Sequence, residues 1–192
     1  MTNFGATILD ASGLRLTAQE KALFREVRPF GFILFGRNID TPEQVRALCA
    51  ELRDAAGHDA VITIDQEGGR VQRLRPPFWR DWSPPLDFVQ AAGENAVEAM
   101  YLRYRLIAHE LHEVGIDSNC APMVDVAGTQ THDFLRNRCY GTDPRQVIKL
   151  GRAAADGMLA GGVLPVVKHM PGHGRATMDS HFDLPLISAS YE

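Results

Sequence analysis

The stretch VLPVVKHMPGHG, at residues 163–174, decides the fold of this chain. Its first five residues form a short apolar run, which is typical of a buried strand in a parallel sheet. Lys168 and His169 follow this strand directly, and a Pro-Gly-His-Gly turn then opens a loop rich in titratable side chains. In α/β proteins such loops, at the carboxyl ends of parallel strands, hold the chemistry. The stretch therefore predicts a parallel sheet with a functional site at its carboxyl edge.

The rest of the chain alternates between strand and helix patterns. Helix starts are marked by Thr17 and Thr41, each followed three residues later by Glu or Gln in a capping-box pattern, and by Asp143 before a proline. Short apolar runs predict strands at residues 6–9, 31–35, 60–64, 117–124 and 164–167. Before the fourth strand, helical spacing predicts one buried stripe, formed by Val97, Met100, Tyr104, Ala108 and Leu111.

This alternation requires a parallel sheet with right-handed crossovers. Polar residues fall where strands end, with Asp65 after the third strand, Asp125 after the fourth, and Lys168 and His169 after the fifth. Their placement predicts the catalytic face of a (β/α)₈ TIM-type barrel. A doubly wound open sheet is the alternative, although no Gly-x-Gly-x-x-Gly follows the first strand. Because a barrel typically takes about 250 residues, we expect these 192 residues to hold an incomplete one of about five strands.

Composition argues against several classes of protein. Apolar residues make up 45% and charged residues 23%, which is ordinary for a globular domain. The net charge of −4, without a basic cluster, disfavours nucleic-acid binding. No secretory signal is visible, and no apolar run approaches the roughly 18 residues of a membrane span. Three cysteines without Cys-x-x-Cys spacing fit a reducing compartment, so we expect a cytoplasmic protein with no membrane partner.

The triplet Asp179-Ser180-His181 predicts a proton-transfer dyad. A carboxylate near an imidazole fixes its tautomer and leaves the other ring nitrogen free to exchange a proton near neutral pH. Two other interpretations compete with the dyad. Histidines and Asp179 could ligate a metal, but no clean ligand spacing appears, and Ser180 lacks the Gly-x-Ser-x-Gly elbow of a nucleophile. The dyad explains the triplet better than a metal site, a serine nucleophile or a solvated surface turn.

Four motifs follow one another along the chain: IDQEGGRVQR at 64–73, NCAPMVDV at 119–126, RCYG at 138–141, and KHMPGHG at 168–174 with Asp-Ser-His after it. Together they resemble the signature of bacterial β-N-acetylhexosaminidases of glycoside hydrolase family 3, of the NagZ type. The Asp-Ser-His loop distinguishes the β-N-acetylhexosaminidases from the related family 3 β-glucosidases, which lack it. Met170 and the pair Cys139-Tyr140 depart from the usual phenylalanine and Ser-Phe, and both changes are conservative in packing.

The resemblance implies a function and a site. It implies retaining hydrolysis of terminal β-linked N-acetylglucosamine, from cell-wall muropeptides in peptidoglycan recycling, without a metal or organic cofactor. His181 would be the acid/base and Asp179 would orient it. Glu67 and Arg70 would brace the Gly68-Gly69 turn, and Asp125 could be structural or functional. The sugar would be bound by Asp65, Arg73, Arg138, Lys168 and His169.

The resemblance also implies a missing group. In the family the nucleophile is an aspartate well downstream of the Asp-Ser-His loop, and no residue of this chain matches it. We therefore expect residues 1–192 to be a single catalytic barrel domain, truncated before the nucleophile-bearing portion and inactive alone. Its partner would be a small carbohydrate, and open barrel edges would favour self-association. The alternative is a noncatalytic, truncated sugar-binding or interaction protein.

Overall fold

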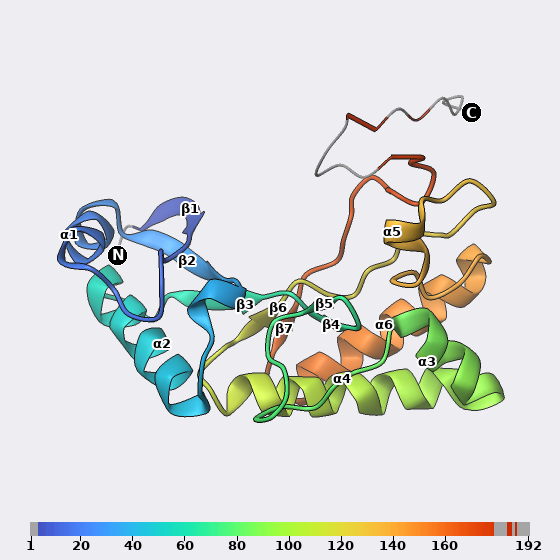
Figure 1. The fold of residues 1–192 in the computed structure, drawn as a ribbon, viewed down its shortest axis with the longest axis horizontal. Coiled ribbons are helices and arrows are strands. Elements are labelled where there is room, and N and C mark those ends of the chain that lie inside the picture. Colours follow the sequence, from blue (N-terminus) through green and yellow to red (C-terminus); the bar gives the residue numbers. More distant parts are fainter. Residues whose placement is uncertain (1–3, 179–183, 186, 188–192) are drawn as a thin grey trace.

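The structure of the chain is a computed structural model that describes residues 4–178, 184, 185 and 187. Five strands of this part form one parallel sheet, in the order β1-β2-β3-β6-β7 (Figure 1). Their bounds are β1 Gly5–Leu9, β2 Pro29–Leu34, β3 Val61–Ile64, β6 Ser118–Asn119 and β7 Leu164–Pro165. All five predicted strands are present, and the last two are shorter than expected.

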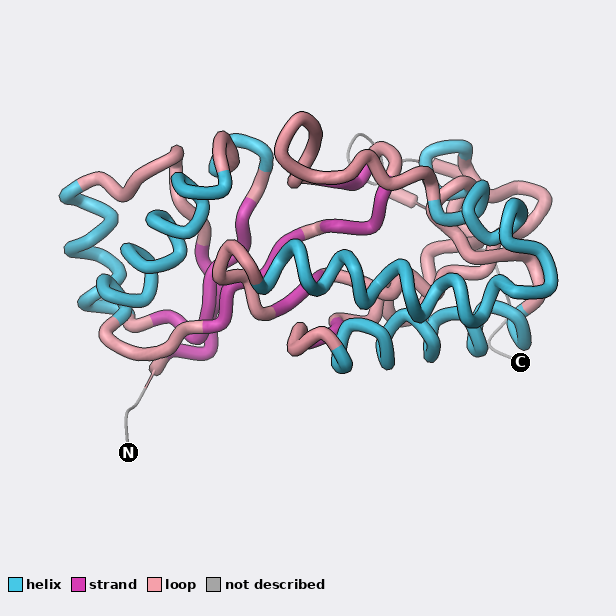
Figure 2. The backbone as a smooth tube through the Cα atoms, turned by 90° about the horizontal axis from the view of Figure 1, so that it is seen from below, coloured by secondary structure: helices cyan, strands magenta, loops and turns pink. Residues whose placement is uncertain are grey.

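Helices connect the strands, and the two longest of them, each of 17 residues, cover the sheet from one side. The helices are α1 Ala18–Val27, α2 Pro42–Ala56, α3 Pro85–Ala92, α4 Ala96–His112, α5 Asp133–Arg136 and α6 Pro144–Ala160, with short 3₁₀ turns η1 Gly36–Asn38 and η2 Gly93–Asn95. In Figure 1, α4 and α6 lie below the sheet, and the view from below in Figure 2 places them in front of it. A doubly wound sheet carries helices on both faces, whereas a barrel has one outer layer. The prediction of an incomplete TIM-type barrel is confirmed.

The predicted helix starts are confirmed, with one correction. Thr17 forms a complete capping box at α1, in which its side chain and that of Glu20 exchange hydrogen bonds with the backbone. At α2, the Thr41 hydroxyl accepts a bond of 3.2 Å from the Gln44 amide. The Gln44 side chain, however, accepts from the Asp40 amide instead of returning to Thr41, so this box is only half formed. A neighbouring backbone donor has competed for the same carboxamide oxygen.

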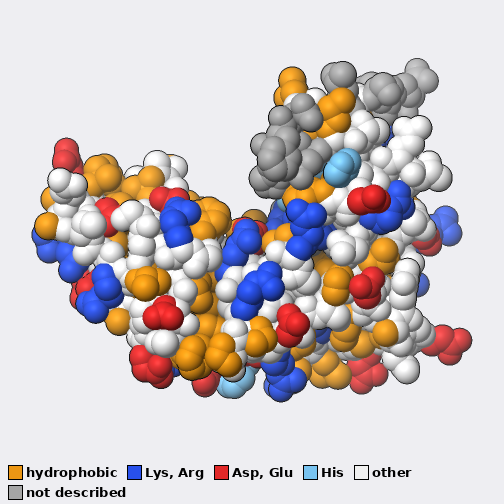
Figure 3. All heavy atoms as spheres, in the orientation of Figure 1, with side chains coloured by type: hydrophobic (Ala, Val, Ile, Leu, Met, Phe, Trp, Pro, Cys, Tyr) orange, Lys and Arg blue, Asp and Glu red, His pale blue; other side chains and the backbone are white. Residues whose placement is uncertain are grey.

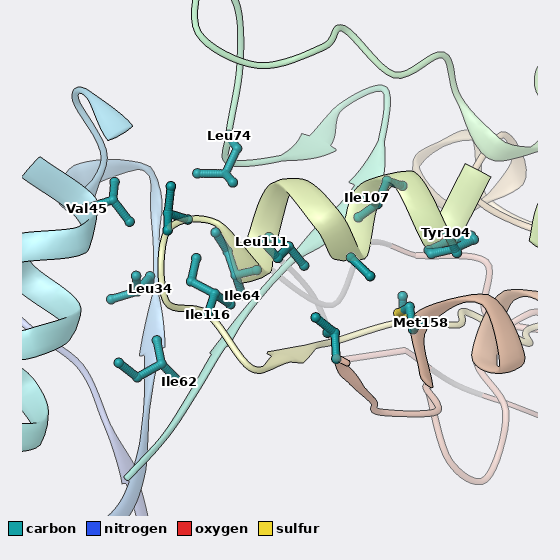
Figure 4. Close-up of a cluster of buried hydrophobic side chains, with 14 of the residues drawn as sticks. Leu34, Val45, Ile62, Ile64, Leu74, Tyr104, Ile107, Leu111, Ile116 and Met158 are labelled. Atoms are coloured by element: carbon teal, nitrogen blue, oxygen red, sulfur yellow. The ribbon is translucent and has the colours of Figure 1, made fainter. Parts of the chain in front are cut away.

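The main core lies between the sheet and the helix layer. Figure 4 shows Ile62 and Ile64 of β3 facing Leu111 of α4, and all three side chains are fully buried. The predicted stripe on α4 is buried at Met100, Tyr104, Ala108 and Leu111. The expectation for Val97 is wrong, because this residue is 46% exposed. It belongs to the first turn of α4, where it lines a surface groove beside α6 instead of the sheet.

Prolines shorten the last two strands. Pro122 and Pro165 have no backbone N–H, so neither can donate to a regular ladder. Parallel pairing is interrupted after β6 and resumes at a single bridge between Met123 and Lys168, where the Val124 amide donates to the Lys168 carbonyl at 2.8 Å. The predicted strand at 117–124 is therefore wrong in its length. Its irregular second half still runs beside the residues that follow β7.

Both outer strands of the sheet leave apolar side chains open to solvent. Ile8 on β1 and Leu164 on β7 are each 52% exposed. A closed barrel would pair both strands with further strands and remove these edges. Self-association through the edges stays a prediction.

The helices and the cysteines were both subjects of the sequence predictions. Among the described residues, no helix combines the length and the apolarity that crossing a bilayer requires. Cys49, Cys120 and Cys139 are all free, and burial raises the pKa of Cys49 and of Cys139 to about 12. Thiols of this kind stay protonated and unreactive at neutral pH. Cys49 and Cys139 are buried and pack as small apolar side chains.

Candidate active site

The chain turns back on itself directly after β3, in a hairpin that the sequence analysis did not predict. Its antiparallel strands are β4 Gln66–Gly68 and β5 Val71–Gln72. Gly68 and Gly69 have φ values of 109° and 60°, which L side chains rarely adopt, and a Cβ on Gly68 would clash with the guanidinium of Arg103. The Gly-Gly pair is therefore required by the turn. The hairpin returns the chain to the carboxyl edge of the sheet.

Asp65, between β3 and the hairpin, is held by two cations. Its Oδ1 lies 2.9 Å from Nζ of Lys168, and its Oδ2 lies 3.1 Å from a terminal guanidinium nitrogen of Arg73. The side chain is 18% exposed. Burial raises the pKa of Asp65, but the charges and hydrogen bonds of Lys168 and Arg73 outweigh it, so the pKa lies below its ordinary value. Asp65 is thus an ionised hydrogen-bond acceptor at the mouth of the barrel.

The low pKa of Asp65 predicts an acid-sensitive contribution to folding. A depressed pKa stabilises the folded state above the ordinary value of 3.8, and this stabilisation is lost as pH falls through the lower folded pKa. We expect Asp65→Asn to lower the free energy of unfolding at pH 7 and to differ less from wild type near pH 3 (about one unit below the ordinary carboxyl pKa). Urea unfolding at both values measures it. Asp59→Asn, at a carboxylate that is 96% exposed, is the control and should change little; an equal loss at both pH values would contradict the prediction.

Glu67 lies at the centre of the charged cluster and is fully buried. It receives two parallel hydrogen bonds from Arg138, of 3.0 and 2.9 Å, and it also forms an ion pair with Lys168. Its backbone carbonyl accepts a bond of 2.9 Å from Arg103. The sequence analysis gave Glu67 a bracing role in the glycine turn. The structure gives Glu67 a larger role, because its carboxylate contacts both Arg138 and Lys168, two of the residues predicted to bind the sugar.

Arg138 reaches the cluster from the segment after α5. Burial lowers the pKa of Arg138, but its hydrogen bonds and charge interaction with Glu67 outweigh it and raise the pKa above the ordinary value. The guanidinium carbon also lies 5.2 Å from the ring centroid of Phe134, and the guanidinium carbon of Arg70 lies 3.9 Å from the same centroid. Arg70 is thus stacked on a ring and does not enter the Asp65 cluster. Arg73, not Arg70, pairs with Asp65 beside Lys168.

His169 follows Lys168 and contacts a different carboxylate. Its Nδ1 lies 2.6 Å from Oδ2 of Asp125, which comes from the irregular stretch after β6. The other oxygen, Oδ1, accepts a bond of 2.5 Å from the backbone N–H of His173. Asp125 is nearly inaccessible, with 1% of its side chain exposed, whereas His169 keeps 38%. The sequence analysis left the role of Asp125 open between structural and functional. The position of Asp125 directly after a predicted strand was the signal that could have marked it as a site residue.

The structure thus brings together five of the seven predicted site residues. Asp65, Arg73, Lys168 and Arg138 belong to one ionic cluster, with His169 adjacent in the chain. Figure 3 shows Lys and Arg side chains grouped in the middle of one face, below a concave stretch of the outline. The predicted acid/base residues Asp179 and His181 lie outside the described residues, so the dyad stays a prediction.

A cavity opens beside Arg73. Its volume is about 490 Å³, and it is lined by residues 75–79, which include Pro76 and Pro77, and by Asp40. The exposed ring of Phe78 belongs to this lining. As for metals, no group of three or more His, Cys, Asp or Glu side chains in the described part of the chain is arranged to hold an ion.

Comparison with known proteins identifies the family. Residues 7–192 match the family described as Glycosyl hydrolase family 3 N terminal domain. The chain belongs to this family. It is 37% identical over 188 residues to a beta-hexosaminidase of Tolumonas auensis, covering 98% of this chain and 55% of the relative. It is 39% identical over 188 residues to a beta-hexosaminidase of Pseudomonas aeruginosa, with the same coverage.

Solved structures of family 3 enzymes also match this chain. The crystal structure of NagZ from Neisseria gonorrhoeae, in complex with N-trifluoroacetyl-D-glucosamine, matches with a TM-score of 0.90 at 32% identity. The match covers 98% of this chain and 56% of that protein. A family 3 beta-N-acetylglucosaminidase from Paenibacillus matches with a TM-score of 0.85 at 34% identity, over 93% of this chain and 34% of that one. This family 3 chain therefore spans about 55% of the length of the curated relatives it matches.

Proposed function

We propose that this family 3 chain is the N-terminal part of the catalytic barrel of a retaining glycoside hydrolase. The proposed substrate is a saccharide with a terminal β-linked N-acetylglucosamine, as in cell-wall muropeptides recycled in the cytoplasm. The observation that carries the proposal is the ion-paired cluster of Asp65, Arg73, Lys168 and Arg138 at the carboxyl edge of the sheet. Catalytic residues of (β/α)₈ barrels lie at this edge.

The cluster suits a neutral, hydroxyl-rich ligand. Asp65 can accept hydrogen bonds from sugar hydroxyls, while Lys168 and Arg73 donate to sugar oxygens from positions that Asp65 already fixes. Since the charges are paired before a ligand arrives, a sugar can bind without bringing a counter-ion. Groups held in place beforehand also lose little conformational entropy on binding. The Tolumonas and Pseudomonas relatives are named beta-hexosaminidases, and gonococcal NagZ is complexed with a glucosamine derivative, which supports a sugar of this class.

The proposed mechanism divides the chemistry between two parts of the protein. A retaining glycosidase needs an acid/base on one side of the anomeric carbon and a nucleophile on the other. His181 would protonate the leaving oxygen and then activate water, while Asp179 orients the imidazole and stabilises its charged form. The nucleophile would come from a segment that follows these residues. Asp65, Arg73, Arg138, Lys168 and His169 would bind the sugar and hold the anomeric carbon between the two.

The experiment separates catalysis from binding. We expect the full-length protein to hydrolyse a chromogenic β-N-acetylglucosaminide and the 192-residue chain alone to give only background rates. The matching β-glucoside, which lacks the acetamido group, is the control substrate and should be hydrolysed far more slowly. Calorimetry with N-acetylglucosamine tests binding by each protein. Clear turnover by the purified 192-residue chain would contradict the proposed division, and no turnover by the full-length protein would leave the noncatalytic sugar-binding alternative.

A further inference from the structure

Asp125 holds two separate parts of the chain through one buried carboxylate. Its Oδ2 contacts Nδ1 of His169 at 2.6 Å, and its Oδ1 accepts the His173 amide at 2.5 Å. Asp125 follows β6, whereas both histidines follow β7. We propose that Asp125 is a positioning residue, which sets the ring tautomer of His169 and anchors the turn that leads to Asp179 and His181. Its catalytic consequence rests on the proposed function, but its structural consequence does not.

The tautomer follows from the charge of Asp125. Burial raises the pKa of Asp125, but the hydrogen bonds from His169 and from the His173 amide outweigh it, so the pKa lies below the ordinary value. An ionised carboxylate has no proton to donate, so Nδ1 of His169 must carry the hydrogen in their contact. In the neutral imidazole, Nε2 is then an acceptor. The His169 side chain is 38% exposed. In the proposal, its Nε2 is the acceptor that a hydroxyl donor of the sugar would meet.

The second oxygen of Asp125 secures the turn. Gly174, the residue after His173, lies so close to the backbone of Val126 that a Cβ on Gly174 would clash with the Val126 carbonyl. The Gly174 carbonyl also accepts a hydrogen bond from the Thr131 hydroxyl. These contacts fasten residues 173–174 to the stretch that carries Asp125. The segment that continues to Asp179 and His181 thus starts from a fixed point, and the same carboxylate fixes His169.

Asp125→Asn tests both bonds with a side chain of the same shape. The Asn oxygen can still accept the His173 amide, but its NH₂ group can only donate to His169. His169 would then have to accept at Nδ1 and carry its hydrogen on Nε2, which reverses the polarity of the edge offered to a sugar. Asp143→Asn is the matched control. Asp143 is the exposed N-cap of α6, where Asp and Asn are about equally favourable.

Nitrogen-15 NMR of histidine-labelled full-length protein reads the tautomer directly. Seven histidines are present, and the His169 signals are those that disappear in His169→Gln. We expect the Nδ1–H form in the wild-type protein and in Asp143→Asn, and the Nε2–H form in Asp125→Asn. The Nε2–H form in the wild-type protein would overturn the proposal without the use of any variant.

Kinetics supply the second readout. We expect Asp125→Asn to lower kcat/KM for a β-N-acetylglucosaminide by roughly 10–100-fold, the range typical of removing a carboxylate that orients a metal-binding histidine. The Asp143→Asn protein should match wild type. An active wild type with an unchanged tautomer and unchanged kinetics in Asp125→Asn would refute the positioning role and leave the proposed function intact. A tautomer change in a protein without glycosidase activity would refute the function and leave the positioning role.

Discussion

Replacing His181 with alanine in the full-length protein is expected to lower kcat by about 10²–10⁴-fold on a substrate with a poor leaving group. The reason is the proposed acid role, since an alkoxide leaving group must be protonated as the glycosidic bond breaks. An activated aryl glycoside needs little protonation, so its glycosylation step should be much less affected. Pre-steady-state kinetics with both substrates measures the difference. Equal losses for the two substrates in that step would argue against His181 as the acid.

Two further variants test the same role, one in the partner of His181 and one as a control. Asp179→Asn should show the same pattern in a milder form, because it keeps the shape of the side chain and loses the charge that supports the imidazolium. His109→Ala is the matched control for a histidine deletion. The His109 side chain is 71% exposed on α4, and we expect its loss to leave both rates unchanged.

Glu67→Gln is expected to lower the free energy of unfolding by about 3–5 kcal/mol, the usual effect of removing one partner of a buried ion pair. The change keeps the volume of the side chain but removes the negative charge between Arg138 and Lys168, whose side chains are only 6% and 12% exposed. A carboxamide NH₂ would also face a cation. Urea unfolding at pH 7 measures the loss, and sugar binding should weaken with it.

Glu43→Gln provides the comparison on the surface. Its carboxylate pairs with Arg46 one turn along α2 and is 76% exposed. Pairs of this kind contribute about 0–1 kcal/mol. If both Glu→Gln variants lost the same small amount, the Glu67 cluster would hold no more stability than a surface pair. There would then be no physical basis for the role of Glu67 in positioning Arg138 and Lys168, two of the residues proposed to bind the sugar.

Local signals in the sequence predicted much of the fold. The caps at Thr17 and Asp143 are determined by side chains within three residues of the backbone groups they satisfy. The buried strands follow from short apolar runs, such as β3. The parallel pairing of the strands then follows from their connection by helices. These features depend on neighbours in the sequence, which is why they could be predicted without coordinates.

The features that were missed depend on distant neighbours. The β4–β5 hairpin is only a few residues long, and its polar sequence has no apolar alternation to mark it. Glu67 meets Arg138 across 71 residues, and Asp125 meets His169 across 44. No local pattern tells which of several carboxylates will face which cation. The strand-end rule could place these residues at one edge of the sheet, but it could not pair them.

The long separation of these partners determines when the site can appear. Asp65 and Lys168 lie 103 residues apart, so their contact forms only after the chain has passed through β7. During synthesis the two carboxylates near β3 emerge first and stay hydrated, because a buried Glu67 without its cations is unfavourable. Closing so long a loop has an entropic penalty that only the packed sheet offsets. Competence to bind sugar should therefore arise no earlier than the docking of β7, which brings Lys168 to its two carboxylates.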